Sequence, residues 1–121
     1  MKKFEAEFYE KSNGDIPVED FLCNLNVKLR VKMVGLISIL EEKGNLLREP
    51  YSRHLEDWIF ELRWKVGTDI VRVLYFFYYE GKIVFTNGFV KKTQKTPREE
   101  IRKAKEYRKD YIERSQKNEK I

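Results

Sequence analysis

The stretch WIFELRWKVGTDIVRVLYFFYYEGKIVFTNGFV, residues 58–90, decides the fold. In its first segment large apolar residues largely alternate with polar or charged ones, which is the period of a β-strand. Two further apolar segments follow, and the dipeptides Gly67-Thr68 and Glu80-Gly81 separate the three. Because such dipeptides suit the two-residue turns of hairpins, we predict a meander of three antiparallel strands.

The two turns also predict the pairing between these strands. If each turn holds two residues, counting back from them places Arg63 opposite Arg72, and Arg72 opposite Phe89. Side chains directly across from one another share a face of the sheet, so these three residues form a predicted row. Lys65 and Lys91 lie one pair further along the same face. A bulge at Gly88 would shift the last pairing.

The segments before the meander predict one strand and two helices. Phe4, Ala6 and Phe8 alternate with charged residues, as in a half-buried strand. Pro17 suits the first turn of an amphipathic helix, and a second helix is expected at about residues 28–43. Residues 45–57 contain a proline and no clear periodicity, so we expect a loop there.

A third helix is expected after the meander. Pro97 opens it, Thr96 is its expected N-cap, and residues 115–121 are expected to be a frayed tail. The predicted order is therefore β-α-α-β-β-β-α, in one domain covering residues 1–121. This order indicates an α+β fold, in which two N-terminal helices pack on an antiparallel sheet and a C-terminal helix follows.

Composition argues against several classes of protein. Cys23 is the only cysteine and His54 the only histidine, which excludes an internal disulfide and argues against a transition-metal site. The chain has no P-loop and no glycine-rich dinucleotide motif, so no cofactor is expected. The longest apolar run, residues 73–79, is far shorter than the roughly 20 residues of a membrane span. We expect a cytoplasmic protein, since the N-terminus lacks the apolar run of a signal peptide.

Positive charge is concentrated in the second half of the chain. The net charge is +5, but residues 1–57 carry −2 and residues 58–121 carry +7. Residues 87–95 hold three lysines and no acidic residue. Such asymmetry indicates a polyanionic partner, although a solvated basic helix produces the same excess.

The predicted row has two interpretations. Arg63 and Arg72 facing each other repel, and an RNA phosphate held between them would remove the repulsion. Alternatively, Glu56 and Glu61 neutralise the arginines on an ordinary solvated sheet. The lysines at the end of the third segment also have two interpretations. They extend the arginine row, or they only discourage edge-to-edge aggregation beside an apolar strand.

Residues 58–111 resemble the HigB-like toxins, the phage-derived branch of the RelE/ParE superfamily. The resemblance lies in ELR at residues 61–63, RVLYF at 72–76, GFVKKTQKTP at 88–97, and a helix rich in Glu, Ala, Lys and Arg at 99–111. It implies a RelE-like fold and a type II toxin that enters the ribosomal A site and cuts mRNA without a metal. It also implies attack of the RNA 2′-OH on the adjacent phosphate, and a HigA-like helix-turn-helix antitoxin as partner.

The resemblance implies roles for individual residues. Arg63 and Arg72 are expected to clamp the scissile phosphate, and Lys91 or Lys92 to add charge or transfer a proton. Phe89 is expected to stack on a base. The expected contacts with the RNA backbone come from Lys65, Lys95 and Arg98. The general base stays open between Glu61, His54 and a lysine, because the matching C-terminal region has no histidine.

Two alternative functions remain at this stage. One is a ParE-like toxin that inhibits gyrase, against which the arginine row argues, since a toxin that binds a protein does not require it. The other is a non-catalytic RNA- or DNA-binding module, which predicts salt-sensitive binding without a cleaved product.

Overall fold

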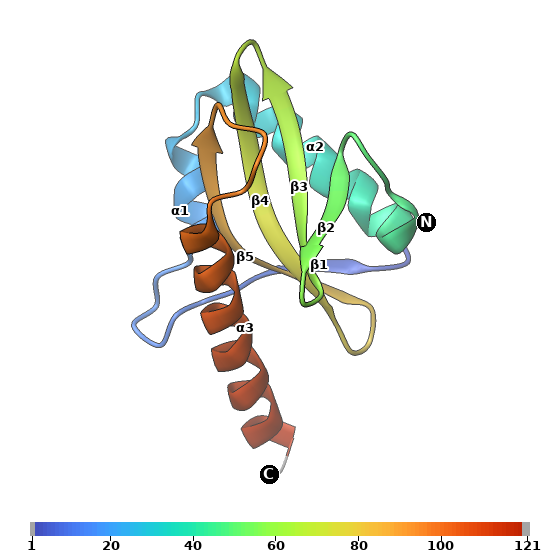
Figure 1. Ribbon diagram of the computed structural model, residues 1–121. Helices are drawn as coiled ribbons and strands as arrows, with labels where there is room; N and C mark the ends of the chain where they lie inside the picture. Colours follow the sequence, from blue (N-terminus) through green and yellow to red (C-terminus); the bar gives the residue numbers. More distant parts are fainter. Residues whose placement is uncertain (1, 120–121) are drawn as a thin grey trace.

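The computed structural model describes residues 2–119 (Figure 1). Its elements are β1 (Glu5–Phe8), α1 (Pro17–Asn24), α2 (Val27–Lys43), the short 3-10 helix η1 (Gly44–Leu46), β2 (Ser52–Glu56), β3 (Ile59–Val66), β4 (Asp69–Tyr78), β5 (Lys82–Lys91) and α3 (Arg98–Glu119). Pro17 occupies the first turn of α1, and Gly44 ends α2 with a positive φ of 54°, which glycine adopts without strain.

The five strands form one sheet in the order β1-β5-β4-β3-β2. β1 is parallel to β5, whereas the other neighbours are antiparallel. The predicted α+β class, with two N-terminal helices and one C-terminal helix, is confirmed. The prediction of an antiparallel sheet is wrong, because the sheet is mixed. The sequence pattern of a strand reports which side chains alternate, but not the direction of the strand beside it.

The loop predicted at residues 45–57 is also wrong in part. Ser52–Glu56 forms β2, which pairs with β3 through Ser52 opposite Leu62 and His54 opposite Phe60. Pro50 precedes the strand and therefore removes none of its ladder hydrogen bonds. A five-residue edge strand with one apolar residue has too little periodicity to be recognised from its own sequence.

The predicted pairing of the arginine row is confirmed, although two details differ and cancel. Arg63 faces Arg72, and Arg72 faces Phe89. The β4–β5 turn, however, holds three residues, because Tyr78 rather than Tyr79 pairs with Lys82. A register shift between positions 74 and 75 of β4, rather than a bulge at the glycine of β5, restores the predicted pairing beyond it.

Helices cover both faces of the sheet. On one face, α1 and α2 pack through a core that includes Leu22, Met33, Leu40, Leu62 and Phe85. On the other, which we call the α3 face, Ala104 of α3 packs with Ile59, Leu74, Phe76, Val84 and Phe89. The apolar run of β4, residues 73–78, follows from this arrangement, since a strand covered on both sides buries side chains of both faces.

Gly88 permits the close approach of α1 to the sheet. A Cβ atom at this position would lie 2.3 Å from a ring carbon of Phe21. The glycine of the GF string at residues 88–89 is therefore required for packing, and its position in β5 is regular.

The C-terminal helix is longer than expected. Residues 115–119, predicted to be frayed, continue α3, and residues 120–121 lie outside the described residues. Within residues 2–119, no helix is both long and apolar enough to cross a bilayer.

Candidate nucleic-acid interface

Glu61 lies at the centre of a buried ionic cluster on the α3 face. Its side chain is completely buried, and Arg53 Nε and Arg63 Nε lie 3.5 Å and 3.6 Å from its Oε2. Arg72 Nη1 lies 3.7 Å from Oε1, and Thr96 Oγ1 donates a hydrogen bond of 2.7 Å to the same oxygen. We call these five residues the Glu61 cluster.

The strand pattern assembles this cluster. Glu61 and Arg63 are two residues apart on β3 and so share a face. Arg53 is directly opposite Glu61 on β2, and Arg72 is directly opposite Arg63 on β4. The carboxylate therefore offsets part of the repulsion between the two facing arginines.

Thr96 connects the cluster to the segment before α3. The prediction that Thr96 caps α3 is not met, because its hydroxyl donates to Glu61 and the helix begins at Arg98. The backbone N–H groups of Glu100 and Ile101 bond to the carbonyl of Pro97 instead. The Thr96 hydroxyl, which the local sequence had predicted to cap α3, thus binds the buried Glu61 carboxylate instead.

Arg72 is a buried cation. Its side chain has no exposed surface, and none of its three guanidinium nitrogens has a hydrogen-bond partner among the described residues. The guanidinium carbon lies 5.6 Å from the centre of the Phe89 ring, within the range of a cation–π contact. Burial lowers the pKa of Arg72, the Glu61 carboxylate opposes this effect, and Arg63 and Arg53 lower the pKa further.

Burial changes what the predicted row can contact. Arg72 has no exposed surface and Phe89 has 8% of its surface exposed. Phe89 packs with Ala104 of α3, and Arg72 lies between Phe89 and Glu61. In this conformation neither side chain is accessible to RNA. The sequence alternative was that Glu61 and Glu56 neutralise the arginines. Glu61 does form ion pairs with Arg63 and Arg72, but these ion pairs are buried and not on a solvated surface.

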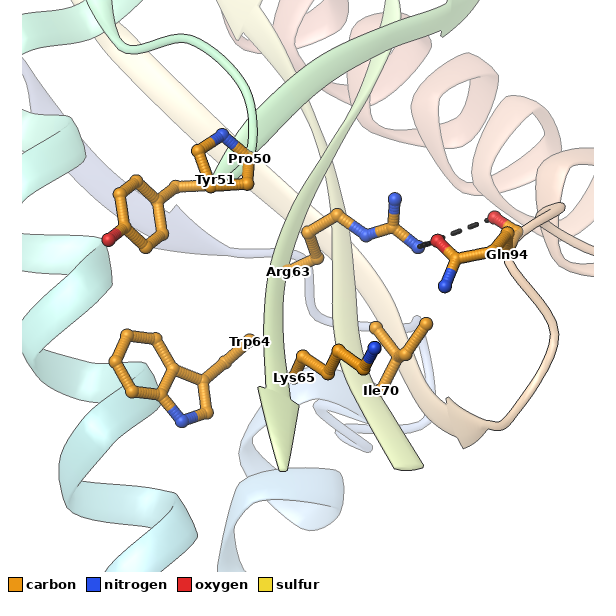
Figure 2. Close-up of a pocket in the computed structure, with 7 residues that line it drawn as sticks. All are labelled: Pro50, Tyr51, Arg63, Trp64, Lys65, Ile70 and Gln94. Carbon is orange, nitrogen blue, oxygen red and sulfur yellow. Dashed lines mark hydrogen bonds between the residues drawn. The ribbon is translucent and has the colours of Figure 1, made fainter. Parts of the chain in front are cut away.

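Arg63 is the member of the row that reaches a pocket. Its Nη2 donates to the backbone oxygen of Gln94 at 3.3 Å and to Gln94 Oε1 at 3.5 Å (Figure 2). The pocket is lined by Pro50, Tyr51, Arg63, Trp64, Lys65, Ile70 and Gln94. Arg63 and Lys65 are two residues apart on β3, so their positive charges lie on the same face of the strand.

Exposed lysines lie around the end of β5. Lys91, Lys92 and Lys95 are exposed, as is Lys65 on β3. Ile70, which pairs with both Lys65 and Lys91, places these two lysines in one cross-strand line. Among the described residues, none of the four lysines forms an ion pair with an acidic side chain.

Arg98 differs from these lysines because it is neutralised. Its Nη2 donates to Glu56 Oε2 at 3.1 Å, its Nη1 also contacts Glu56 Oε1, and Lys105 Nζ donates to Oε2 at 2.6 Å. These hydrogen bonds, first that of Arg98 and then that of Lys105, lower the pKa of Glu56 to about 2. The expected backbone contact of Arg98 would therefore compete with Glu56.

The two named candidates for the general base do not reach the cationic surface. Glu61 is buried within its cluster. His54 is exposed but is paired with Phe60, which lies on the opposite face of β3 from Glu61 and Arg63. His54 Nε2 accepts a hydrogen bond from the backbone N–H of Trp58 at 3.2 Å.

Four residues of the site were not anticipated: Arg53, Tyr51, Gln94 and Thr96. Arg53 and Tyr51 were missed because residues 45–57 were interpreted as a loop, and the short edge strand β2 has too little periodicity to reveal that Arg53 pairs with Glu61. Gln94 and Thr96 act through contacts more than 30 residues away in sequence, for which no local signal exists. In residues 2–119, no group of three or more His, Cys, Asp or Glu residues is arranged to hold a metal ion.

Comparison with known proteins gives one family. The family model described as Phage derived protein Gp49-like (DUF891) matches residues 20–109. The matched region begins in α1, contains all of α2 and strands β2 to β5, and ends within α3. It includes the Glu61 cluster and the four lysines. A search of curated proteins found no match.

Proposed function

The chain belongs to the phage-derived Gp49-like family, which is related to the RelE-type toxins of toxin–antitoxin systems, and we propose on this premise that it is the toxin of a type II system. We further propose that it cuts mRNA in the ribosomal A site without requiring a metal ion. The observation that carries the proposal is the set of lysines without ion pairs beside Arg63, a surface suited to a phosphate backbone.

The proposed reaction is a transesterification within the RNA. The 2′-oxygen forms a bond to the adjacent phosphorus while the bond from phosphorus to the next 5′-oxygen breaks. A base takes the proton of the 2′-OH, and an acid gives a proton to the 5′-oxygen. The products are a 2′,3′-cyclic phosphate and a 5′-OH. Positive charge close to the phosphate lowers the barrier, because negative charge accumulates on its oxygens in the transition state.

Arg63 is the residue that we assign to the phosphate. Its guanidinium reaches the pocket and already binds two oxygens of Gln94. Arg72 is assigned as a positioning residue. It has no exposed surface, and it pairs with the same Glu61 carboxylate that holds Arg63. Lys91 and Lys92 are exposed and able to exchange protons with the substrate, while Lys65 and Lys95 are assigned to flanking phosphates.

The toxin assignment implies an antitoxin. We propose a HigA-like helix-turn-helix protein whose acidic residues cover the lysines and so compete with RNA. A complex of this kind would keep the cationic surface neutral until the antitoxin is removed.

The test is a purified translation reaction programmed with a defined mRNA, in which 5′ ends are mapped by primer extension. Wild-type protein should give cuts at A-site codons that require ribosomes. Arg63→Ala and Lys91→Ala should reduce cutting by about 10²- to 10³-fold, the effect of removing one group that stabilises the transition state. Lys28→Ala, at an exposed position of α2, is the matched control and should cut like wild type. Intact mRNA in the presence of folded wild-type protein would refute the nuclease.

A gyrase-inhibiting function is the second candidate, because the Glu61 cluster weakens the argument against it. The arginine row had argued against gyrase inhibition, but Glu61 forms ion pairs with both arginines within the fold, so the row does not need an RNA phosphate to be accommodated. Inhibition of gyrase supercoiling, together with intact mRNA in the translation reaction, would select this alternative.

A further inference from the structure

The pocket beside Arg63 lies at an open edge of the sheet. β2 pairs with β3 only as far as Ser52 opposite Leu62, and the N–H of Arg63 donates to the carbonyl of Tyr51 at 2.8 Å. Beyond that contact, no strand in residues 2–119 pairs with Trp64 and Lys65 on the side away from β4. The pocket occupies this edge, and its volume is about 240 Å³. Small-molecule sites commonly measure about 300–1,000 Å³, so this pocket suits a single base rather than a whole cofactor.

One side of the pocket is aromatic. The rings of Tyr51 and Trp64 are nearly parallel, with an angle of 16° between their planes and 6.2 Å between their centres. The Lys32 ammonium lies 5.4 Å from the centre of the Trp64 ring. Tyr51 keeps 42% of its surface exposed, so it has area available for another flat group.

The other side of the pocket is cationic. Figure 2 shows Tyr51 and Trp64 on one side of β3, and Arg63, Ile70 and Gln94 on the other. Arg63 Nη2 binds the two oxygens of Gln94, which mark positions where phosphate oxygens would be accepted. Exposed Lys65 lies beside it on the same strand. A ligand that crosses the β3 edge in this pocket therefore meets both an aromatic and a cationic surface.

We propose that this pocket binds one nucleotide of single-stranded RNA, with its base stacked on Tyr51 and its phosphate held by Arg63 and Lys65 in place of Gln94. The choice of RNA rests on the proposed function, whereas the pairing of an aromatic and a cationic surface does not. Tyr51 thus takes the stacking role that the sequence had suggested for Phe89, whose ring is buried against Arg72. Stacking on an aromatic ring tolerates any base, so the pocket adds affinity with little base preference.

The test uses tryptophan fluorescence with two RNA probes, a hexauridylate and an abasic hexamer with the same number of phosphates. A Trp58→Phe background leaves Trp64 as the only tryptophan, and Trp58 is 74% exposed, so this change is tolerated. Tyr51→Ala should weaken hexauridylate binding by about 5- to 150-fold, the range for loss of one stacked base. Tyr51→Phe should bind like wild type, because the ring remains.

The abasic hexamer distinguishes the loss of base stacking from a general loss of folded protein. Its affinity should be equal for wild type and Tyr51→Ala, whereas Arg63→Ala should weaken both probes. Tyr79→Ala removes another exposed tyrosine, in the β4–β5 turn, and should change neither affinity. Equal losses for both probes with Tyr51→Ala, unchanged hexauridylate binding, or no binding to wild type would each overturn the proposal. Because the titration contains no ribosome, a failed cleavage assay would refute the nuclease without affecting this result.

Discussion

Replacing Glu61 by glutamine should destabilise the protein strongly, although the change leaves side-chain size almost unaltered. The carboxylate faces three arginines, and one of them, Arg72, is completely buried. Glutamine can still accept the hydrogen bond of Thr96 through its amide oxygen, so the charge is the quantity that changes. Glu61→Gln therefore leaves Arg72 as an uncompensated charge inside the protein.

The expected size follows from that burial. Removing one partner of a buried ion pair costs about 3–5 kcal/mol, because the remaining charge stays desolvated. An unfolding entropy of about 2.1 cal/mol/K per residue gives about 0.25 kcal/mol/K for this chain, so each kcal/mol lowers Tm by about 4 °C. Glu61→Gln should then lower Tm by about 12–20 °C.

The double variant Glu61→Gln/Arg72→Met tests the cause. Removing both charges eliminates the uncompensated cation, and such replacements are often neutral or stabilising, so the double variant should recover most of the lost Tm. Glu56→Gln is the matched control, since Glu56 pairs with cations at the surface, and it should change Tm far less. Calorimetry with chemical denaturation as a second probe measures all three. A Tm for Glu61→Gln within a few degrees of wild type, or no recovery in the double variant, would refute the reasoning.

Three further predictions concern packing, hydrogen bonding and pH. Gly88→Ala should cost about 1–3 kcal/mol of unfolding free energy in urea titrations, because its Cβ would meet the Phe21 ring, and Phe21→Leu in the same chain should recover part of the loss. Thr96→Val should cost about 1.5–3 kcal/mol, because it leaves a buried carboxylate oxygen without its donor, whereas Thr93→Val, at an exposed hydroxyl, should change stability by less than about 0.5 kcal/mol; equal effects would contradict the role of Thr96. Glu56 has a folded pKa of about 2 against an ordinary 4.5, so its ion pairs should stabilise the fold above about pH 4.5 and lose that effect as pH falls toward 2. The Tm difference between wild type and Glu56→Gln should therefore shrink between pH 6 and pH 2.5, and a constant difference would contradict this assignment.

Much of the candidate site followed from local sequence. The period of β3 and the turn at Gly67-Thr68 were sufficient to place Arg63 opposite Arg72, because a two-residue turn leaves one pairing for the strands it joins. The pairing of Arg72 with Phe89 was correct only because a longer turn and a bulge offset each other. The exposed Lys91, Lys92 and Lys95 also followed from the sequence, since a strand end rich in lysine and followed by Pro97 has little to bury.

The sequence by itself therefore determined the meander, the helices and the sign of the surface charge, which all depend on neighbours a few residues apart. Tertiary structure alone decided that α3 and the segment before it pack on the second face of the sheet, where Arg72 and Phe89 are buried while Arg63 lines a pocket. The physical reason is that the burial of an arginine depends on a carboxylate to pair with it and on other parts of the chain to exclude water. The β3–β4 hairpin places Glu61 near Arg72, but the segment leading into α3 reaches this face only through packing across the domain, which no local pattern records.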